Sequence, residues 1–448
     1  MPTSSFPTDF LWGAATSAYQ IEGSPLADGA GESIWHRFSH RAGKIEGGDN
    51  GDVACDHYRR MTDDVRLMRE LGLQSYRFSI AWGRVLPEGT GRINQAGVDF
   101  YSRLVDTLLE YDIIPSATLY HWDLPAVLDD RGGWAYADAP QWFTEYAELM
   151  FRALGDRVPM WTTLNEPWVA MDNGYVTGGH APGRRDWREA ALVSHNLLRS
   201  HAAAVALYRS HWKHKIGLVV NLVPVEPATD SAADRAAAVR MDAYLNRHFL
   251  DPALLGTFPD EMPELFGDAW PTIDREAAAA LRQPVDFIGV NYYLRIYVRD
   301  DPAAGPSRAT VVSPPDRPRT ALGWEIYANG LADTLQWVSD RYDNVPQYVT
   351  ENGAAFDDFP APDGTINDAA RVQYLKEHLQ AALQALQAGV RLRGYFVWSL
   401  LDNFEWHFGY SKRFGIVRVD YPTQRRTPKA SARFYADVIR SRGTALEA

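Results

Sequence analysis

Eight near-continuous apolar runs recur along the chain. They cover residues 10–19, 75–82, 114–120, 158–165, 216–223, 285–293, 347–351 and 394–400. Runs of this length, without strict alternation of apolar and polar positions, are typical of parallel strands that are buried on both faces. The pattern therefore predicts eight buried strands.

Stretches with the apolar spacing of an amphipathic helix separate these runs. The clearest cover residues 62–71, 98–111, 141–154, 189–211, 232–250, 331–341, 369–388 and 429–439. Strand followed by helix, eight times, is typical of a closed (β/α)8 TIM barrel, an α/β fold that tolerates extended βα loops. The alternative is an open doubly wound sheet, but that fold favours a glycine-rich phosphate loop such as GxGxxG, which the sequence lacks. We predict the barrel.

Length and composition agree with one large unit. The 448 residues are 46% hydrophobic, and because they show no repeat, linker or low-complexity break we expect residues 1–448 to form a single barrel domain. The proline-rich residues 300–319 are interpreted as a long loop. A formal net charge of −12 argues against nucleic acid or an anionic membrane as a partner.

The sequence also predicts a cellular compartment. The single cysteine, Cys55, permits no intramolecular disulfide, which fits a reducing environment. The first residues lack the basic and apolar regions of a signal peptide, and no apolar stretch approaches the length of a membrane span. We expect a soluble, cytoplasmic protein, and the sequence does not indicate its oligomeric state.

Two glutamates stand where predicted strands end. Glu166 follows the run 158–165 and precedes Pro167, which cannot donate a hydrogen bond to a sheet and so ends the strand. Glu351 ends the seventh run and is followed by Asn352, a residue suited to turns. Because a barrel places its active site at the carboxyl ends of its strands, we interpret the two glutamates as a catalytic pair.

Polar and aromatic residues gather at the same end of the other predicted strands. Hydroxyl-binding amides, imidazoles and carboxylates mixed with indole rings suit a neutral polyhydroxylated ligand, because a sugar offers both hydroxyls and apolar C–H faces. The residues are Gln20, Arg77, His121, Trp122, Asn165, Asn221, Asn291, Tyr293, Trp398, Glu405 and Trp406.

Two carboxylates can cleave an acetal without a metal or an organic cofactor, and we expect neither here. Glu166 is interpreted as the general acid/base, because the nearby charge of Glu351 would raise its pKa. Glu351 is interpreted as the nucleophile, kept ionised by Arg77 and Tyr293. Arg77 has a second, compatible interpretation as a structural ion pair inside the barrel.

Two other clusters are interpreted as structural. Residues 49–52 read DNGD, which resembles part of a calcium loop, but they lack its alternating ligands and its final glutamate, so we expect a turn. His211 and His214 share a helix face near a helix end and are interpreted as a solvated terminus. No metal site is predicted from the sequence.

Six motifs together resemble family 1 of the glycoside hydrolases, the β-glucosidase family, from residue 6 to at least residue 435. Residues 10–23 read FLWGAATSAYQIEG, 77–82 RFSIAW, 163–167 TLNEP, 289–293 GVNYY, 350–353 TENG and 398–406 WSLLDNFEW. The resemblance implies a (β/α)8 barrel and a retaining exo-β-glycosidase with a Glu acid/base and a Glu nucleophile. Retention requires carboxyl groups roughly 5 Å apart rather than about 6.5–9.5 Å.

The resemblance also implies a role for each site residue. Tyr293 would contact the nucleophile, Asn291 would lie beside the acid/base, and Trp398 would lie under the sugar ring. The hydroxyls of the terminal sugar would be held by Gln20, His121, Asn165, Glu405 and Trp406, and we place Trp122 and Phe414 with this group. The leaving-group side would be lined by Trp168, Asn221 and Trp324.

Differences from two branches of this family restrict the range of expected substrates. Plant myrosinases of this family carry Gln where Glu166 stands, and the 6-phospho-glycosidase branch typically carries Ser in place of Glu405, so we expect an unphosphorylated β-glucoside or cello-oligosaccharide as substrate. Lys412 fits the phosphate branch, but Phe414 does not. A relative that prefers galactose or fucose, and a barrel that binds sugars without hydrolysing them, are the alternatives.

Overall fold

Eight parallel strands close into a barrel in the computed structural model, which describes residues 5–447. Around the barrel the strand order is β1, β2, β3, β4, β5, β7, β10, β11 and back to β1. Their bounds are β1 Leu11–Ala15, β2 Ser75–Ser79, β3 Ile114–Tyr120, β4 Met160–Asn165, β5 Lys215–Asn221, β7 Phe287–Asn291, β10 Gln347–Asn352 and β11 Leu392–Trp398. The predicted (β/α)8 barrel is confirmed, and each of the eight apolar runs supplies one of its strands.

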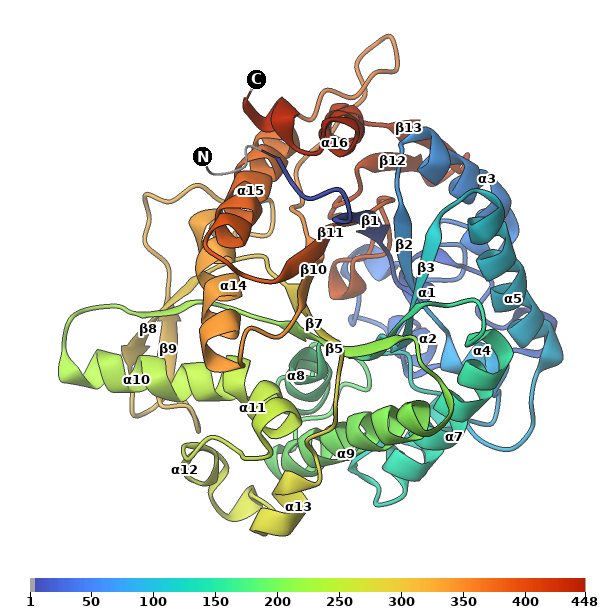
Figure 1. Cartoon of the computed structure of the whole chain (residues 1–448). Coiled ribbons are helices and arrows are strands. Elements are labelled where there is room, and N and C mark those ends of the chain that lie inside the picture. Colours follow the sequence, from blue (N-terminus) through green and yellow to red (C-terminus); the bar gives the residue numbers. More distant parts are fainter. Residues whose placement is uncertain (1–4, 448) are drawn as a thin grey trace.

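Long helices surround the barrel (Figure 1). They are α3 His57–Glu70, α5 Gln95–Glu110, α7 Ala139–Leu154, α9 Trp187–His211, α10 Ala232–Asp242, α11 His248–Leu255, α14 Asn329–Arg341, α15 Ala369–Gln387 and α16 Ala430–Ser441. Helix α5 illustrates why they form: Tyr101, Leu104 and Leu108 recur at helical spacing on its buried face, whereas Glu110 is exposed.

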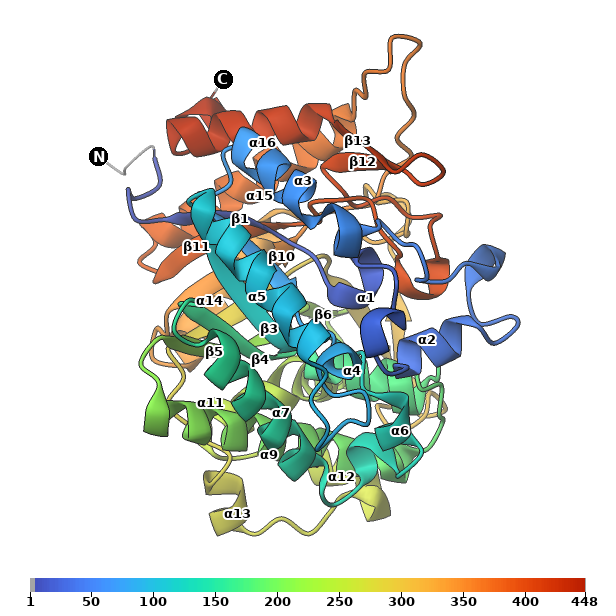
Figure 2. The same ribbon diagram turned by 90° about the vertical axis from the view of Figure 1, so that its right-hand side faces the viewer.

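Shorter elements lie in the connections. The helices are α1 Ala18–Ile21, α2 Ile34–Ser39, α4 Trp82–Val85, α6 Ala126–Asp129, α8 Pro167–Met171, α12 Met262–Phe266 and α13 Arg275–Ala279. The strands are β6 Val225–Pro227, β8 Ile296–Asp300, β9 Ala309–Val312, β12 Val417–Asp420 and β13 Arg425–Pro428. Helices α1, α2 and α6 gather at the right-hand end of the barrel in Figure 2, the end to which β1 points.

The first predicted strand, residues 10–19, is too long. Strand β1 ends at Ala15, the chain turns, and helix α1 begins three residues later at Ala18. The N–H of Ala18 donates to Ser79 Oγ at 2.7 Å instead of continuing the ladder. Because of this turn, Gln20 lies on a helix and not at the end of a strand.

Two other expectations need correction. The helix predicted for residues 232–250 is α10 followed by a π-helix, Ala243–Arg247, and then α11, since the Asn246 side chain bonds both the N–H and the C=O of Val223 at 2.9 Å. The loop predicted for residues 300–319 contains β9, which pairs antiparallel with β8. Strand β9 has four residues, which are too few to show the alternation of apolar and polar positions by which a strand is recognised, and the stretch around it is rich in proline.

A buried ion network supports the loop that follows β11. Lys429 Nζ donates to Asp402 Oδ1 at 2.8 Å and to Asp358 Oδ2 at 2.7 Å, and Arg413 Nη1 donates to Asp402 Oδ2 at 2.7 Å. Lys429 and Asp402 are fully buried. Each charge therefore depends on its partners, because an unpaired charge in such a position is costly.

None of the helices in residues 5–447 combines the length and apolar character that crossing a lipid bilayer requires.

Candidate active site

Glu166 is held in a fixed backbone position at the carboxyl end of β4. Its φ of 46° lies in the left-handed region, and its N–H donates to the carbonyl of Val219 at 2.9 Å. Pro167 then begins α8. Asn291 Nδ2 donates to Glu166 Oε1 at 2.7 Å, so the carboxyl group is oriented from β7 while its backbone is fixed by β5.

Glu351 lies inside β10 and receives a hydrogen bond on each carboxylate oxygen. Arg77 Nη1 donates to Oε1 at 2.6 Å, and the Tyr293 hydroxyl donates to Oε2 at 2.7 Å. Glycine at position 353 is required next, because a Cβ there would lie 1.6 Å from the carbonyl oxygen of Trp398. The local sequence thus brings the seventh and eighth strands together directly beside Glu351.

A hydrogen-bonded network joins four strands below the two glutamates. Arg77 Nη2 and Asn291 Nδ2 both donate to Asn165 Oδ1, at 2.6 and 3.1 Å. Thr350 Oγ1 donates to Asn291 Oδ1 at 2.7 Å, and Asn165 Nδ2 donates to His121 Nε2 at 3.1 Å. His121 therefore carries its proton on Nδ1, which has no partner among the described residues.

The environment gives the two glutamates different protonation states. Burial, and then the charge of Glu351, raise the pKa of Glu166 to about 8. Burial also raises the pKa of Glu351, but Arg77 and the hydroxyl of Tyr293 act in the opposite direction. A proton shared by the pair is accordingly held by Glu166, to which no cation among the described residues is bonded.

Glu405 brings a third carboxyl group to the site. Burial and the charge of Glu351 raise its pKa to about 8, and its Oε2 has no hydrogen-bond partner among residues 5–447. Gln20 lies behind it and donates to Asn403 Oδ1 at 3.1 Å and to the carbonyl of Phe404 at 2.9 Å. The Gln20 amide hydrogens thus hold the loop that carries Glu405.

Aromatic rings form one wall of the site. The ring of Trp398 stacks near that of His121, with centroids 5.8 Å apart and an interplanar angle of 21°. Trp406 lies 4.7 Å from Trp122, whose indole N–H donates to the carbonyl of Asn165 at 2.9 Å. These rings give the site an apolar surface of the kind that sugar rings pack against.

A cavity of about 490 Å³ opens at this end of the barrel, within the usual range for ligand sites. Of the residues predicted from the sequence, it is lined by His121, Trp122, Glu166, Trp168, Asn221, Asn291, Tyr293, Trp324, Glu351, Trp398, Glu405, Trp406 and Phe414. The other three lie buried behind these residues: Arg77 bonds Glu351, Asn165 bonds His121, and Gln20 bonds the loop that carries Glu405.

The outer part of the cavity is mainly apolar, and sequence reasoning missed most of it. Six of its apolar residues are Val169, Leu222, Val223, Met241, Leu245 and Ile296. Asp172 also lines the cavity and accepts a hydrogen bond from Tyr244, and His180 lies 5.6 Å from the ring of Trp122. These residues come from helices, loops, strand β8 and two π-helices that carry no recognisable motif, so the sequence offered no signal for them.

Lys412, which the sequence suggested as a phosphate contact, does not line the cavity. Its Nζ donates to the carbonyl of Ala321 at 3.2 Å, while the neighbouring Phe414 lines the cavity with its ring 6.2 Å from that of Tyr293. The cavity therefore presents carboxyl groups and aromatic rings where a sugar phosphate would need cations.

This arrangement is suited to acetal cleavage. A protonated carboxyl group can donate to a leaving oxygen, and an ionised carboxylate on the other side can attack the acetal carbon or activate a water molecule. His121 and Glu405 line a cavity with aromatic walls, and each has a polar atom without a hydrogen-bond partner among the described residues, so the site offers both kinds of contact that a sugar makes.

Comparisons with known proteins agree with this geometry. The model of the family described as glycosyl hydrolase family 1 matches residues 2–444. The chain is 50% identical over 446 residues to β-glucosidase A of Thermotoga maritima, covering 99% of each chain. It is 49% identical to the 1,4-β-D-glucan glucohydrolase of Thermotoga neapolitana, covering 98% of this chain and 99% of that one.

Solved structures give the same result. The family 1 β-glucosidase of Thermotoga maritima superposes with a TM-score of 0.96 at 49% identity, covering 99% of both chains. The same enzyme in complex with deoxynojirimycin also gives a TM-score of 0.96, covering 98% of this chain and 100% of that one.

Proposed function

The chain belongs to glycosyl hydrolase family 1 and is a β-glucosidase, and we propose that Glu166 is its general acid/base and Glu351 its nucleophile. The observation that carries this assignment is the unequal bonding of the two carboxyl groups. Glu351 accepts from Arg77 and Tyr293, whereas the one side-chain donor to Glu166 among the described residues is the neutral amide of Asn291.

In the first step, Glu351 attacks the anomeric carbon while Glu166 transfers its proton to the glycosidic oxygen. The bond to the leaving group breaks, and a covalent α-linked glycosyl-enzyme forms. Asn291, bonded to Glu166 Oε1, orients the acid toward the leaving oxygen.

In the second step, Glu166, now ionised, takes a proton from a water molecule that attacks the same carbon. The sugar leaves with its original β configuration, and Glu351 is released as a carboxylate. A retaining mechanism requires the carboxyl groups to lie roughly 5 Å apart. A separation of that size agrees with the effect of the Glu351 charge, which raises the pKa of Glu166.

We place the terminal glucosyl ring between Trp398 and Glu405. The unpartnered Nδ1–H of His121 and Oε2 of Glu405 would bond its hydroxyls. Asn165 and Gln20 support these two contacts from behind, with Asn165 bonded to His121.

The leaving-group side favours apolar aglycones. Trp168, Val169 and Trp324 line the outer cavity and would contact an aryl or alkyl group. Cello-oligosaccharides are proposed as a second substrate class, because one relative is named a 1,4-β-D-glucan glucohydrolase. The names of the relatives do not favour the galactose-preferring alternative. A cytoplasmic location stays a prediction that rests on the single, free Cys55.

Azide rescue tests the two roles. In Glu166→Ala, azide should restore turnover of an aryl glucoside with a good leaving group and give the β-glucosyl azide, because the intermediate still forms. In Glu351→Ala, azide should replace the nucleophile itself and give the α-glucosyl azide. Azide products of the opposite configuration in the two variants would reverse the assignment.

A further inference from the structure

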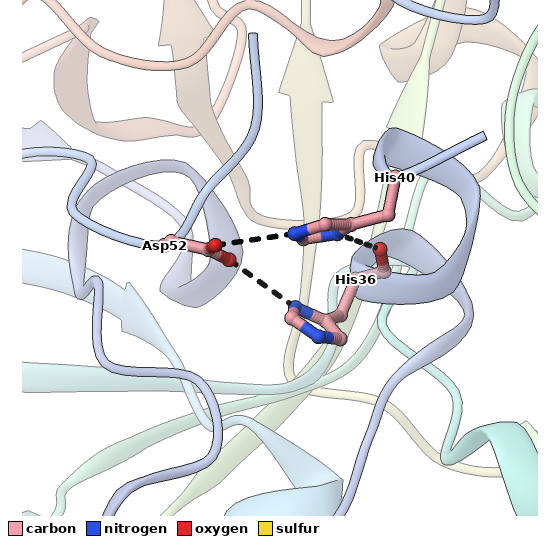
Figure 3. Close-up of side chains that lie close together, drawn as sticks. All are labelled: His36, His40 and Asp52. Carbon is pink, nitrogen blue, oxygen red and sulfur yellow. Dashed lines mark hydrogen bonds and ion pairs between the residues drawn. The ribbon is translucent and has the colours of Figure 1, made fainter. Parts of the chain in front are cut away.

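A cluster of two histidines and an aspartate lies outside the cavity described above (Figure 3). His36 lies in α2, His40 follows that helix directly, and Asp52 belongs to the segment that leads into α3. His36 Nδ1 is 3.4 Å from Asp52 Oδ1, and His40 Nε2 is 3.1 Å from Asp52 Oδ2. Both imidazole rings point toward the carboxylate.

The tautomer of His40 is fixed by the backbone. His40 Nδ1 lies 2.7 Å from the carbonyl oxygen of His36, which can only accept, so Nδ1 carries a proton. The lone pair of Nε2 in the neutral ring then faces a carboxylate oxygen. Two acceptors at this distance require a proton or a cation between them. An N–H bonded to a carbonyl, with the other nitrogen free, is the arrangement that metal-binding histidines usually adopt.

His36 completes the set of donors. Its Nδ1 and the Oδ1 of Asp52 are shielded from solvent and make no hydrogen bond to any described residue. The nitrogen and the oxygen therefore lie 3.4 Å apart, within ion-pair distance but without a hydrogen bond, close enough for one ion to join them.

We propose that His36 Nδ1, His40 Nε2 and the carboxylate of Asp52 bind one divalent transition-metal ion of the Zn²⁺ type. Two imidazoles and one carboxylate favour Zn²⁺ over Mg²⁺ or Ca²⁺, which prefer oxygen ligands alone. The three ligand atoms all lie within 4.8 Å of one another. Tetrahedral Zn²⁺ with bonds of about 2.1 Å needs ligands about 3.4 Å apart, so a small closure suffices.

The site is accessible and its charge is suitable. The side chains of His40 and Asp52 are 40% and 44% exposed, so an ion can enter directly and keep water as its remaining ligand. Glu32 is the other carboxylate whose charge acts on both histidines, and it is paired with Arg37 at 3.1 Å. Because Glu32 is paired with Arg37, Asp52 is the carboxylate of this cluster that is available to bind the ion.

An ion here would join two segments that support the sugar site. Helix α2 carries Trp35, whose ring lies 4.4 Å from that of Trp406. The other segment carries Asp49, whose Oδ2 accepts from the N–H of Tyr410 at 2.9 Å. Metal binding would stabilise the wall behind Trp406 without contacting the substrate.

Titration calorimetry with ZnCl2 on the untagged, chelator-treated full chain tests the proposal. We expect one Zn²⁺ per chain, and an absorption spectrum typical of tetrahedral coordination when Co²⁺ is added instead. His40→Ala and Asp52→Asn should each weaken Zn²⁺ binding by at least about tenfold, since even the loss of an outer partner of a ligand has that effect. His211→Ala removes an exposed histidine elsewhere and is the matched control.

Thermal unfolding separates a metal site from a simple ion pair. Zn²⁺ should raise the Tm of the wild type and of His211→Ala, but not that of the two cluster variants. Hydrolysis of an aryl β-glucoside confirms that these variants fold, because neither His40 nor Asp52 lines the cavity. If Zn²⁺ binds all four proteins equally, or binds none with 1:1 stoichiometry, the cluster is an ordinary pair of protonated His40 with Asp52.

Discussion

Arg77 bonds Glu351 and Asn165 at the same time. Its Nη1 lies 2.6 Å from Glu351 Oε1 and its Nη2 lies 2.6 Å from Asn165 Oδ1. The guanidinium thus links the proposed nucleophile to the amide that orients His121. Both sequence interpretations of Arg77, as partner of the nucleophile and as a buried structural ion pair, describe this one contact, in which the two side chains are 1% and 4% exposed.

Tyr293→Phe should reduce kcat by about 10- to 100-fold. The variant loses the hydroxyl that donates to Glu351 Oε2 at 2.7 Å, and a hydrogen bond to a charged group contributes about 1.5–3 kcal/mol. Tyr292→Phe is the matched control, since its hydroxyl bonds the carbonyl of Tyr327 away from the cavity. Steady-state kinetics on an aryl β-glucoside measures both. Equal losses of kcat would show that Tyr293 has no special role.

The rate should fall as the pH rises through about 8. As the proposed general acid, Glu166 must hold a proton in the first step, and burial together with Glu351 raises its pKa to about 8, so the active form is lost above that value. The basic limb of kcat/KM measures this pKa. Glu405 also has a pKa of about 8, so Glu405→Gln is needed as a control. The limb should persist in that variant, and its disappearance would assign the titration to Glu405.

The free energy of unfolding, like the rate, should fall as the pH rises toward 8. The folded pKa values of Glu166 and Glu405 are raised from 4.5 to about 8, so the folded state holds protons that the unfolded state releases. Their contribution is therefore fully present below about pH 4.5 and is lost as the pH rises toward 8. Between these values the free energy of unfolding of Glu166→Gln should decline less than that of the wild type. Parallel curves would refute the raised pKa.

A glucoside phosphorylated at O6 should be a poor substrate. Above about pH 8, where Glu405 is ionised, its carboxylate would repel the phosphate, and like charges brought together cost several kcal/mol, so kcat/KM above that pH should fall by at least about 100-fold relative to the plain glucoside. Lys412 does not compensate, because it bonds the carbonyl of Ala321. Glu405→Ser should narrow the difference. Faster hydrolysis of p-nitrophenyl β-glucoside 6-phosphate by the wild type would contradict the prediction.

Lys429→Ala should destabilise the chain by about 3–5 kcal/mol, because it leaves Asp402 buried without one of its cations. Arg440→Ala removes an exposed partner of Asp437 and should change the free energy of unfolding by about 0–1 kcal/mol. Denaturant unfolding of both variants measures the difference. Similar values would mean that the buried network contributes no more than a surface ion pair.

The barrel and the two glutamates could be predicted because their signals are local. A buried parallel strand is a continuous apolar run, and Pro167 and Gly353 mark where the chain must leave β4 and β10. The strand ends then meet at one face by the geometry of the barrel alone. Motifs on different strands could therefore be assigned to one site before any contact was known.

The outer part of the cavity, strand β9 and the histidine cluster could not be predicted, because they depend on tertiary contacts that leave no pattern in the sequence. The π-helix Ala243–Arg247, which brings Tyr244 and Leu245 to the cavity, is held by Asn246 bonding Val223. Strand β9 is too short to show alternation. The interpretation of residues 49–52 by themselves as a turn also left out His36 and His40, which lie near Asp52 only after folding.

In the barrel, β7 and β5 lie between β10 and β4, the strands that carry or precede the two glutamates. The spacing of the carboxyl groups is therefore a property of four adjacent strands and not of any insertion. Most of the leaving-group side, by contrast, comes from segments outside those four strands, such as α8 with Trp168 and the loop with Trp324. Evolution or engineering can thus exchange those segments and widen the range of aglycones, while the anomeric configuration of the product is inherited unchanged with the barrel.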